Sequence, residues 1–83
     1  MAPTAEHRFE CTLANGLHAR PASALAEAAG GFASSIVIQR EDGESADMCS
    51  VLSVVGLDVQ RGDAFVVRAE GTDAAEAVSA LRA

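Results

Sequence analysis

The chain has 83 residues, a formal net charge of −6 and no lysine, and three phenylalanines are its only Phe, Tyr or Trp residues. This length suffices for one domain, expected over the whole of 1–83, with a core built mostly from Ala, Val, Leu and Ile. The acidic balance argues against nucleic acids and anionic membranes as partners, and is compatible with a protein that offers a basic surface.

The sequence carries no pattern typical of a membrane anchor, an export signal or a metal site. No apolar stretch approaches the roughly 20 residues needed to span a bilayer. Residues 1–6 lack the basic segment followed by an apolar one that marks a signal peptide. Cys11 and Cys49 are spaced neither as metal ligands nor as a redox pair. Two free thiols suit the reducing cytoplasm. We also expect a monomer with no metal and no cofactor.

A strand, a tight turn and a helix are predicted in the N-terminal part. Apolar and polar residues alternate over 8–13, which is typical of a half-buried strand. Asn15-Gly16 predicts a tight turn. Helical apolar spacing then runs over 19–29, and Gly30-Gly31 ends it as a C-cap would. The apolar positions of this strand and helix are Phe9, Cys11, Leu13, Ala22, Leu25, Ala26 and Ala29.

Two strands and a brief helix are predicted in the middle of the chain. Alternation over 36–39 indicates a strand, and the turn residues 41–43 lead into a short strand near 45–48. Ser50 can cap a brief helix that extends to about Val55.

A fourth strand over 65–70 and a last helix complete the chain. The helix is expected to begin at Asp73, with Glu76 three residues on as in a capping box. The order βαββαβα, with one-sided strands and helices, predicts an α+β open-faced sandwich: a four-stranded antiparallel sheet with helices packed on one face. The apolar stripe of the last helix is Ala74, Ala77, Val78 and Leu81.

The start of the first helix carries the candidate functional residues. His18 takes the N-cap position, where short oxygen-bearing side chains are preferred, so an imidazole there needs another reason. A helix N-terminus suits an anion, and Arg20 adds a planar cation matched to phosphate oxygens. The chemical interpretation is a phosphohistidine, in which an imidazole nitrogen attacks a phosphoryl group and holds it covalently. The competing interpretation is a solvated surface histidine beside an arginine.

The sequence around His18 resembles the active-site motif of HPr, the histidine-containing phosphocarrier family of the bacterial phosphoenolpyruvate:sugar phosphotransferase system. The likeness extends in the family's order over nearly all 83 residues. The matching segments are 16–22, Asp42-Gly43, 50–57, Gly62 and 69–73.

The resemblance implies the same open-faced sandwich and a phosphoryl carrier that is not itself an enzyme. It implies that His18 accepts the group on Nδ1 from phosphorylated enzyme I and passes it to sugar-specific enzyme IIA proteins. Backbone N–H groups of Ala19 and Arg20 then bind the phosphate, and the Arg20 side chain also meets acidic partner residues. Two alternatives are an HPr-like domain of a nitrogen-regulatory or dihydroxyacetone-kinase phosphorelay, and an interaction module that regulates partners without phosphate. The sequence also leaves open whether the chain is a complete protein or a domain of a larger polypeptide.

The brief helix has a capping residue and an apolar surface of interest. Ser50 is expected to cap it. By resemblance, Ser50 also matches the serine that an HPr serine kinase phosphorylates for regulation in some members of the family, although the motif carries over this position and not the kinase. The helix is too short for all its apolar side chains to face the core, so some are expected to be exposed. Asp58 stands where related sequences commonly have glycine, which suggests a left-handed backbone. By resemblance, the surface that docks partners consists of Ala19, Arg20, Val51, Leu52 and Val55.

Overall fold

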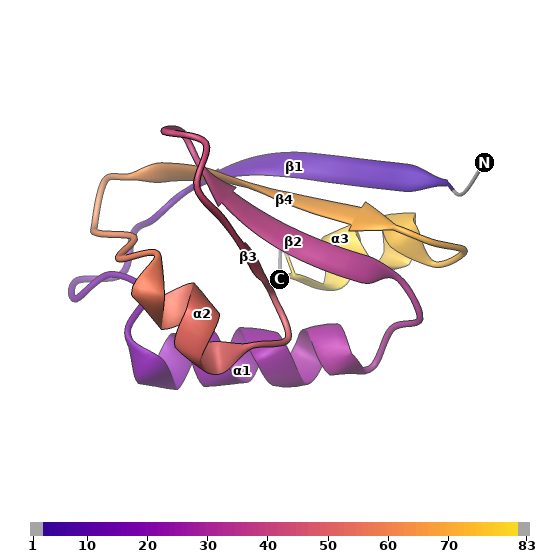
Figure 1. Cartoon of the computed structure of the whole chain (residues 1–83), viewed down its shortest axis with the longest axis horizontal. Coiled ribbons are helices and arrows are strands. Elements are labelled where there is room, and N and C mark those ends of the chain that lie inside the picture. Colours follow the sequence, from indigo (N-terminus) through magenta and orange to yellow (C-terminus); the bar gives the residue numbers. More distant parts are fainter. Residues whose placement is uncertain (1–2, 82–83) are drawn as a thin grey trace.

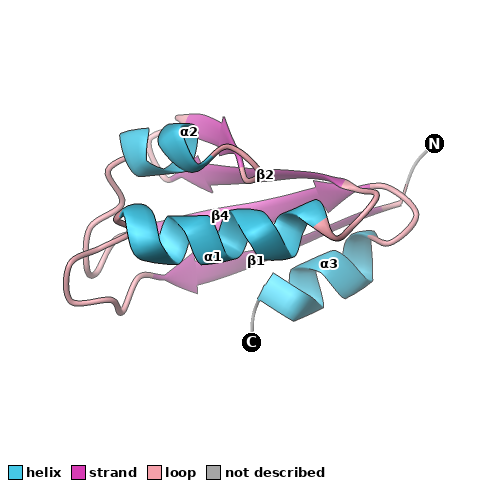
Figure 2. Cartoon of the chain, turned by 90° about the horizontal axis from the view of Figure 1, so that it is seen from below, coloured by secondary structure: helices cyan, strands magenta, loops and turns pink. Residues whose placement is uncertain are grey.

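The computed structural model describes residues 3–81 and has the predicted order βαββαβα. The strands form one antiparallel sheet in the order β1-β4-β2-β3, and the helices lie on one of its faces (Figure 1). Seen from the helical side, α2 and α3 flank α1 (Figure 2). The elements are β1 (Thr4–Glu10), α1 (Ala19–Gly30), β2 (Ser35–Arg40), β3 (Ser45–Asp47), α2 (Val51–Gly56), β4 (Ala64–Glu70) and α3 (Ala74–Leu81).

The core lies between the sheet and the helices and is mostly aliphatic, as the composition predicts, with Phe65, Cys11 and Met48 also buried in it. Alternate residues of β2 and β4 face inward, because successive side chains of a strand point to opposite faces. α1 buries the alanines Ala22 and Ala29, and the small side chains of Ala74 and Ala77 let α3 pack close to β1 and β4. The largest fully buried side chains are Ile38, Met48, Val54, Val59 and Val67.

The first strand is placed wrongly by the sequence. β1 covers Thr4–Glu10 instead of 8–13, because its pairing with β4 ends where Glu10 lies opposite Ala64, the first residue of β4. Cys11 is buried but belongs to the connection that follows. Leu13, expected on the buried face, is 41% exposed at the turn.

The last helix begins where the sequence predicts, but Asp73 acts differently from a capping-box residue. Its carboxylate accepts hydrogen bonds from the N–H groups of Ala33 and Ser34, at 2.8 and 2.9 Å, and from the Ser34 hydroxyl. These donors precede β2, so Asp73 links the start of α3 to that strand. The predicted stripe of Ala74, Ala77, Val78 and Leu81 is buried.

Candidate functional site

His18 occupies the N-cap of α1, as the sequence predicts. Its backbone is extended, with φ −81° and ψ −173°, and its carbonyl accepts the first helical bond from Ala22 N–H at 3.1 Å. The imidazole makes no capping hydrogen bond, and the residue is exposed. The ring is therefore free for chemistry instead of closing the helix.

The residues before His18 are fixed by a close contact between two backbones. Gly16 has a φ of +69°, and a Cβ there would lie 2.4 Å from the carbonyl oxygen of Val59. That same oxygen accepts a hydrogen bond from Leu17 N–H at 2.9 Å, and the Leu17 side chain is buried. The predicted tight turn is present, closed by a 3.0 Å bond from Gly16 N–H to Leu13 O. Only glycine fits at position 16, for both its φ and its lack of a side chain.

The first turn of α1 presents open hydrogen-bond donors. Within residues 3–81, the N–H groups of Ala19 and Arg20 have no acceptor, and Pro21 has no N–H to satisfy. No carboxylate of that part of the chain lies within 4 Å of the Arg20 guanidinium, whereas Arg8, Arg40 and Arg68 are all paired. Two amides and one guanidinium on the helix turn beside His18 suit a bound phosphoryl group.

Ser50 caps α2, as the sequence predicts. Its Oγ accepts a hydrogen bond from Ser53 N–H at 3.3 Å and donates one to the Ser53 hydroxyl at 3.0 Å. At the other end of α2, Asp58 has a φ of +56°, the left-handed conformation expected from its place in the motif.

The apolar residues of α2 divide into three kinds of position. Val54 is fully buried, and Val51 and Val55 are half-buried against the core. Leu52 is 86% exposed. α2 packs beside α1, the helix that begins just after His18, so the exposed leucine and the histidine belong to neighbouring helices (Figures 1 and 2).

Sequence patterns do not single out Arg40, which the structure places in contact with the end of α2. Its guanidinium donates to the carbonyl oxygens of Leu57 and Asp58 at 2.6 and 2.7 Å. An arginine at the end of an alternating strand is ordinarily a solvated residue, and its partners here lie 17 and 18 positions away. No local spacing rule reports such a contact.

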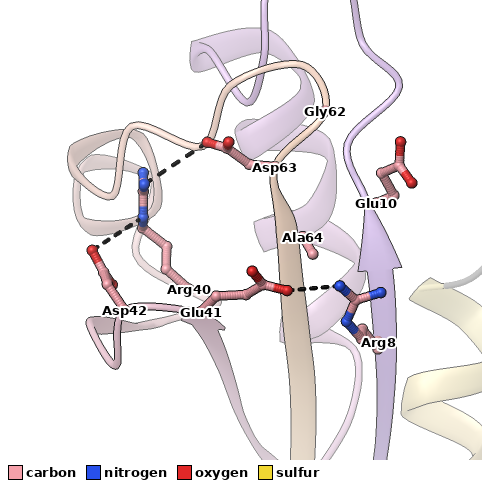
Figure 3. A pocket seen from close by; sticks show the side chains of 8 residues that line it. All are labelled: Arg8, Glu10, Arg40, Glu41, Asp42, Gly62, Asp63 and Ala64. Carbon is pink, nitrogen blue, oxygen red and sulfur yellow. Dashed lines mark hydrogen bonds and ion pairs between the residues drawn. The ribbon is translucent and has the colours of Figure 1, made fainter.

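The site is an exposed helix start and not a cavity. A charged hollow of about 330 Å³ beside Asp63 does not include His18 (Figure 3). Between residues 3 and 81, no cluster of three or more His, Cys, Asp or Glu side chains is arranged to hold a metal ion. In that same range no helix has the length and apolar character to cross a bilayer. Such an open site fits reaction with a group carried by another macromolecule better than enclosure of a small molecule.

A family model described as the PTS HPr component phosphorylation site matches residues 5–83. Together with the open-faced sandwich and the exposed N-cap histidine, this match defines the class of protein as a histidine phosphocarrier. The chain belongs to the HPr family of the phosphotransferase system.

Similar proteins include separate phosphocarriers and one much longer protein. The chain is 42% identical over 66 residues to phosphocarrier protein HPr of Lysinibacillus sphaericus, covering 80% of this chain and 74% of that one. It is 41% identical over 78 residues to a multiphosphoryl transfer protein of Xanthomonas campestris pv. campestris, covering 92% of this chain but only 9% of that protein. The solved structure of a mycoplasma histidine-containing phosphocarrier protein aligns with a TM-score of 0.90 at 33% identity, covering 94% and 88% of the two chains.

Proposed function

We propose that His18 carries a phosphoryl group from phosphorylated enzyme I to sugar-specific enzyme IIA proteins. The observation that carries this proposal is the exposed, uncapped imidazole beside the open N–H groups of Ala19 and Arg20 and the Arg20 guanidinium. The family membership supports the same role.

The transfer step is a substitution at phosphorus. A neutral imidazole nitrogen of His18 forms a bond to phosphorus while the bond from phosphorus to the donor breaks, and the ring's proton leaves from the other nitrogen. Nδ1 is the attacking atom by resemblance to the family. The open amides and Arg20 stabilise the negative charge on the phosphoryl oxygens, which is most of what this reaction requires of a protein. The acceptor's nucleophile later reverses these steps, so the chain is a carrier and not an enzyme.

Partner docking is assigned to the surface formed by α1 and α2 around the histidine. The exposed Leu52 supports this assignment, since a large, exposed apolar side chain on the helix that packs beside α1 favours burial against a partner. The half-buried Val51 and Val55 would contribute the exposed parts of their side chains to the same surface. The docking residues are Ala19, Arg20, Val51, Leu52 and Val55.

Two further assignments follow from the same role. Phosphate on Ser50 would lie next to Leu52 and repel acidic groups of an incoming enzyme I, so modification there would inhibit transfer.

The reactions belong in the cytoplasm, where the phosphoenolpyruvate-driven donor would be found, and need no cofactor in this chain. The nitrogen-regulatory, dihydroxyacetone-kinase and phosphate-free alternatives are not favoured by the family match and the HPr relatives.

Reconstitution tests the proposal. The chain is incubated with phosphoenolpyruvate and enzyme I, and its intact mass is measured before and after addition of an enzyme IIA protein. We expect a gain of one phosphoryl group that is stable in base and labile in acid, followed by its loss to the acceptor. An unchanged mass after the first step would contradict carriage, and a phosphoryl group that no enzyme IIA removes would contradict the assigned acceptor.

A further inference from the structure

Arg40, the last residue of β2, holds the end of α2 from across the fold. Its Nη1 donates to the carbonyl oxygens of Leu57 and Asp58 at 2.6 and 2.7 Å, and its side chain is only 27% exposed. Carbonyls at the end of a helix lack intrahelical partners, and a charged donor satisfies them more strongly than a neutral one. Arg40 therefore fixes the point where α2 gives way to loop 57–63.

Two carboxylates hold the Arg40 guanidinium in place. Its Nε lies 3.6 Å from Asp42 Oδ2, and its Nη2 lies 3.8 Å from Asp63 Oδ2 (Figure 3). The same Asp63 oxygen accepts a hydrogen bond from Gln60 N–H at 2.9 Å. The planar fork of arginine thus reaches both the start and the end of loop 57–63, which a single ammonium does not match.

Loop 57–63 in turn holds segment 11–17, which leads into His18. At one end of the segment, Cys11 N–H donates to Asp63 O and Gly62 N–H donates to Cys11 O, both at 2.8 Å. At the other end, Leu17 N–H donates to Val59 O at 2.9 Å. The Leu17 and Val59 side chains are both buried, so this contact is anchored in the core.

The geometry points to Arg40 as a positioning residue for phosphoryl transfer at His18, acting through loop 57–63 and Leu17. This inference rests on the proposed carrier function. No bond joins Arg40 to His18 in the part of the chain that the structure describes. Loss of the Arg40 side chain therefore changes the orientation of His18. The histidine can still hold one phosphoryl group. Small misplacements of a reacting group have large kinetic effects.

Arg40→Gln is the main test variant, because glutamine retains a donor but loses the charge and the fork. Arg40→Lys retains the charge alone. Arg8→Gln is the matched control: it removes an arginine of the same hollow whose 2.6 Å partner is Glu41 and which does not bond loop 57–63 (Figure 3). For each variant we would measure the rate and final extent of phosphoryl transfer from enzyme I. Hydrogen exchange at the Leu17 and Ile38 amides would be measured in parallel.

We expect Arg40→Gln to slow transfer by roughly 10- to 100-fold with a final extent of one group per chain. Leu17 exchange should accelerate while Ile38, at the centre of β2, stays protected. Arg40→Lys should be intermediate, and Arg8→Gln should match the parent. Parental transfer and Leu17 exchange in Arg40→Gln would overturn the inference, as would equal slowing by Arg8→Gln. If Arg40→Gln does not fold, an Arg40→Lys variant that folds and behaves as the parent does would also overturn it.

Failure of the carrier function gives a different result. In that case the parent chain itself takes no phosphoryl group, while Leu17 exchange still reports whether Arg40 holds segment 11–17. Normal labelling of the parent with an unaffected Leu17 amide in Arg40→Gln would instead contradict the positioning role alone.

Discussion

His18 and Ser50 occupy the same position at the starts of their helices and act differently there. Ser50 turns its oxygen onto the backbone of α2, while His18 leaves the first N–H groups of α1 open. A short polar N-cap contributes about 1 kcal/mol to stability. The start of α1 therefore lacks a stabilising bond that α2 has, and the open donors are available to an anion.

Replacing His18 with serine should stabilise the fold and abolish phosphoryl acceptance. The serine oxygen can cap Ala19–Gly30 and satisfy one open N–H, which is worth roughly 0.5–2 kcal/mol. Urea unfolding would measure this gain, with Ser50→Ala as a control that loses a similar amount. A His18→Ser variant less stable than the parent would contradict the absence of a side-chain cap on α1.

Gly16→Ala should be more damaging than Gly43→Ala. Both glycines have positive φ, +69° and +96°, so both substitutions carry backbone strain of about 1–3 kcal/mol. Only at Gly16 would the new Cβ meet a backbone atom, the Val59 oxygen at 2.4 Å, whereas nothing lies within 4 Å at Gly43. We expect Gly16→Ala to unfold at a lower urea concentration than Gly43→Ala and to slow phosphoryl labelling of His18. Gly43→Ala should lose some stability but label at the rate of the parent. Equal effects on labelling would argue against the Gly16–Val59 contact as a determinant of the site.

α2 presents one large apolar side chain, Leu52, that does not contribute to the packing of the helix against the core. Leu52→Glu should leave thermal stability unchanged, because the leucine is 86% exposed, yet weaken transfer about tenfold by placing a charge in the docked surface. Val37→Glu is the control, since Val37 is 39% exposed on the outer face of β2, away from the helices. A large loss of stability in Leu52→Glu would show that the leucine belongs to the core. Full transfer would remove it from the docking surface.

Periodicity and turn chemistry predict most elements of this fold, because each has a one-sided apolar pattern of its own. The helix at Ala19–Gly30 and the cap at Ser50 follow from spacing and capping preference. Alternation places β1 wrongly for two reasons. Before Phe9, the inward-facing residues of the strand are only Ala5 and His7, which give no strong apolar pattern. The end of the strand is set by its pairing with the distant β4. The position of His18 was predictable from its helix start. The contact between Arg40 and Leu57 is not predictable from the sequence, because tertiary packing alone brings the two residues together.

Asp73 joins two distant parts of the molecule, the start of α3 and the segment before β2. The Ser34 hydroxyl, and then the N–H groups of Ala33 and Ser34, lower the pKa of the Asp73 carboxyl below its usual 3.8. Folding therefore favours the ionised carboxylate. The stability that it contributes is complete above the pKa of the unfolded chain and is lost as pH falls through the lower folded value.

Asp73→Asn should lower the melting temperature near neutral pH, and its difference from the parent should shrink below pH 3.8. Thermal unfolding across pH would measure this. Ser34→Ala removes the largest cause of the lowered pKa of Asp73. In a chain that carries Ser34→Ala, the effect of Asp73→Asn on the melting temperature should therefore depend less on pH. A difference between the parent and Asp73→Asn that is constant across pH would contradict the assigned role of the carboxylate.

The chain has two histidines, and comparing them shows whether His18 is the residue that accepts the phosphoryl group. His7 lies in β1 with its ring against Phe9 at a centroid distance of 4.7 Å, and His18 stands at the start of α1. His7→Ala and His18→Ala would each be incubated with phosphoenolpyruvate and enzyme I, and their intact masses compared with that of the parent. We expect one phosphoryl group on His7→Ala and none on a folded His18→Ala. A phosphoryl group retained by His18→Ala, or lost from a folded His7→Ala, would contradict it.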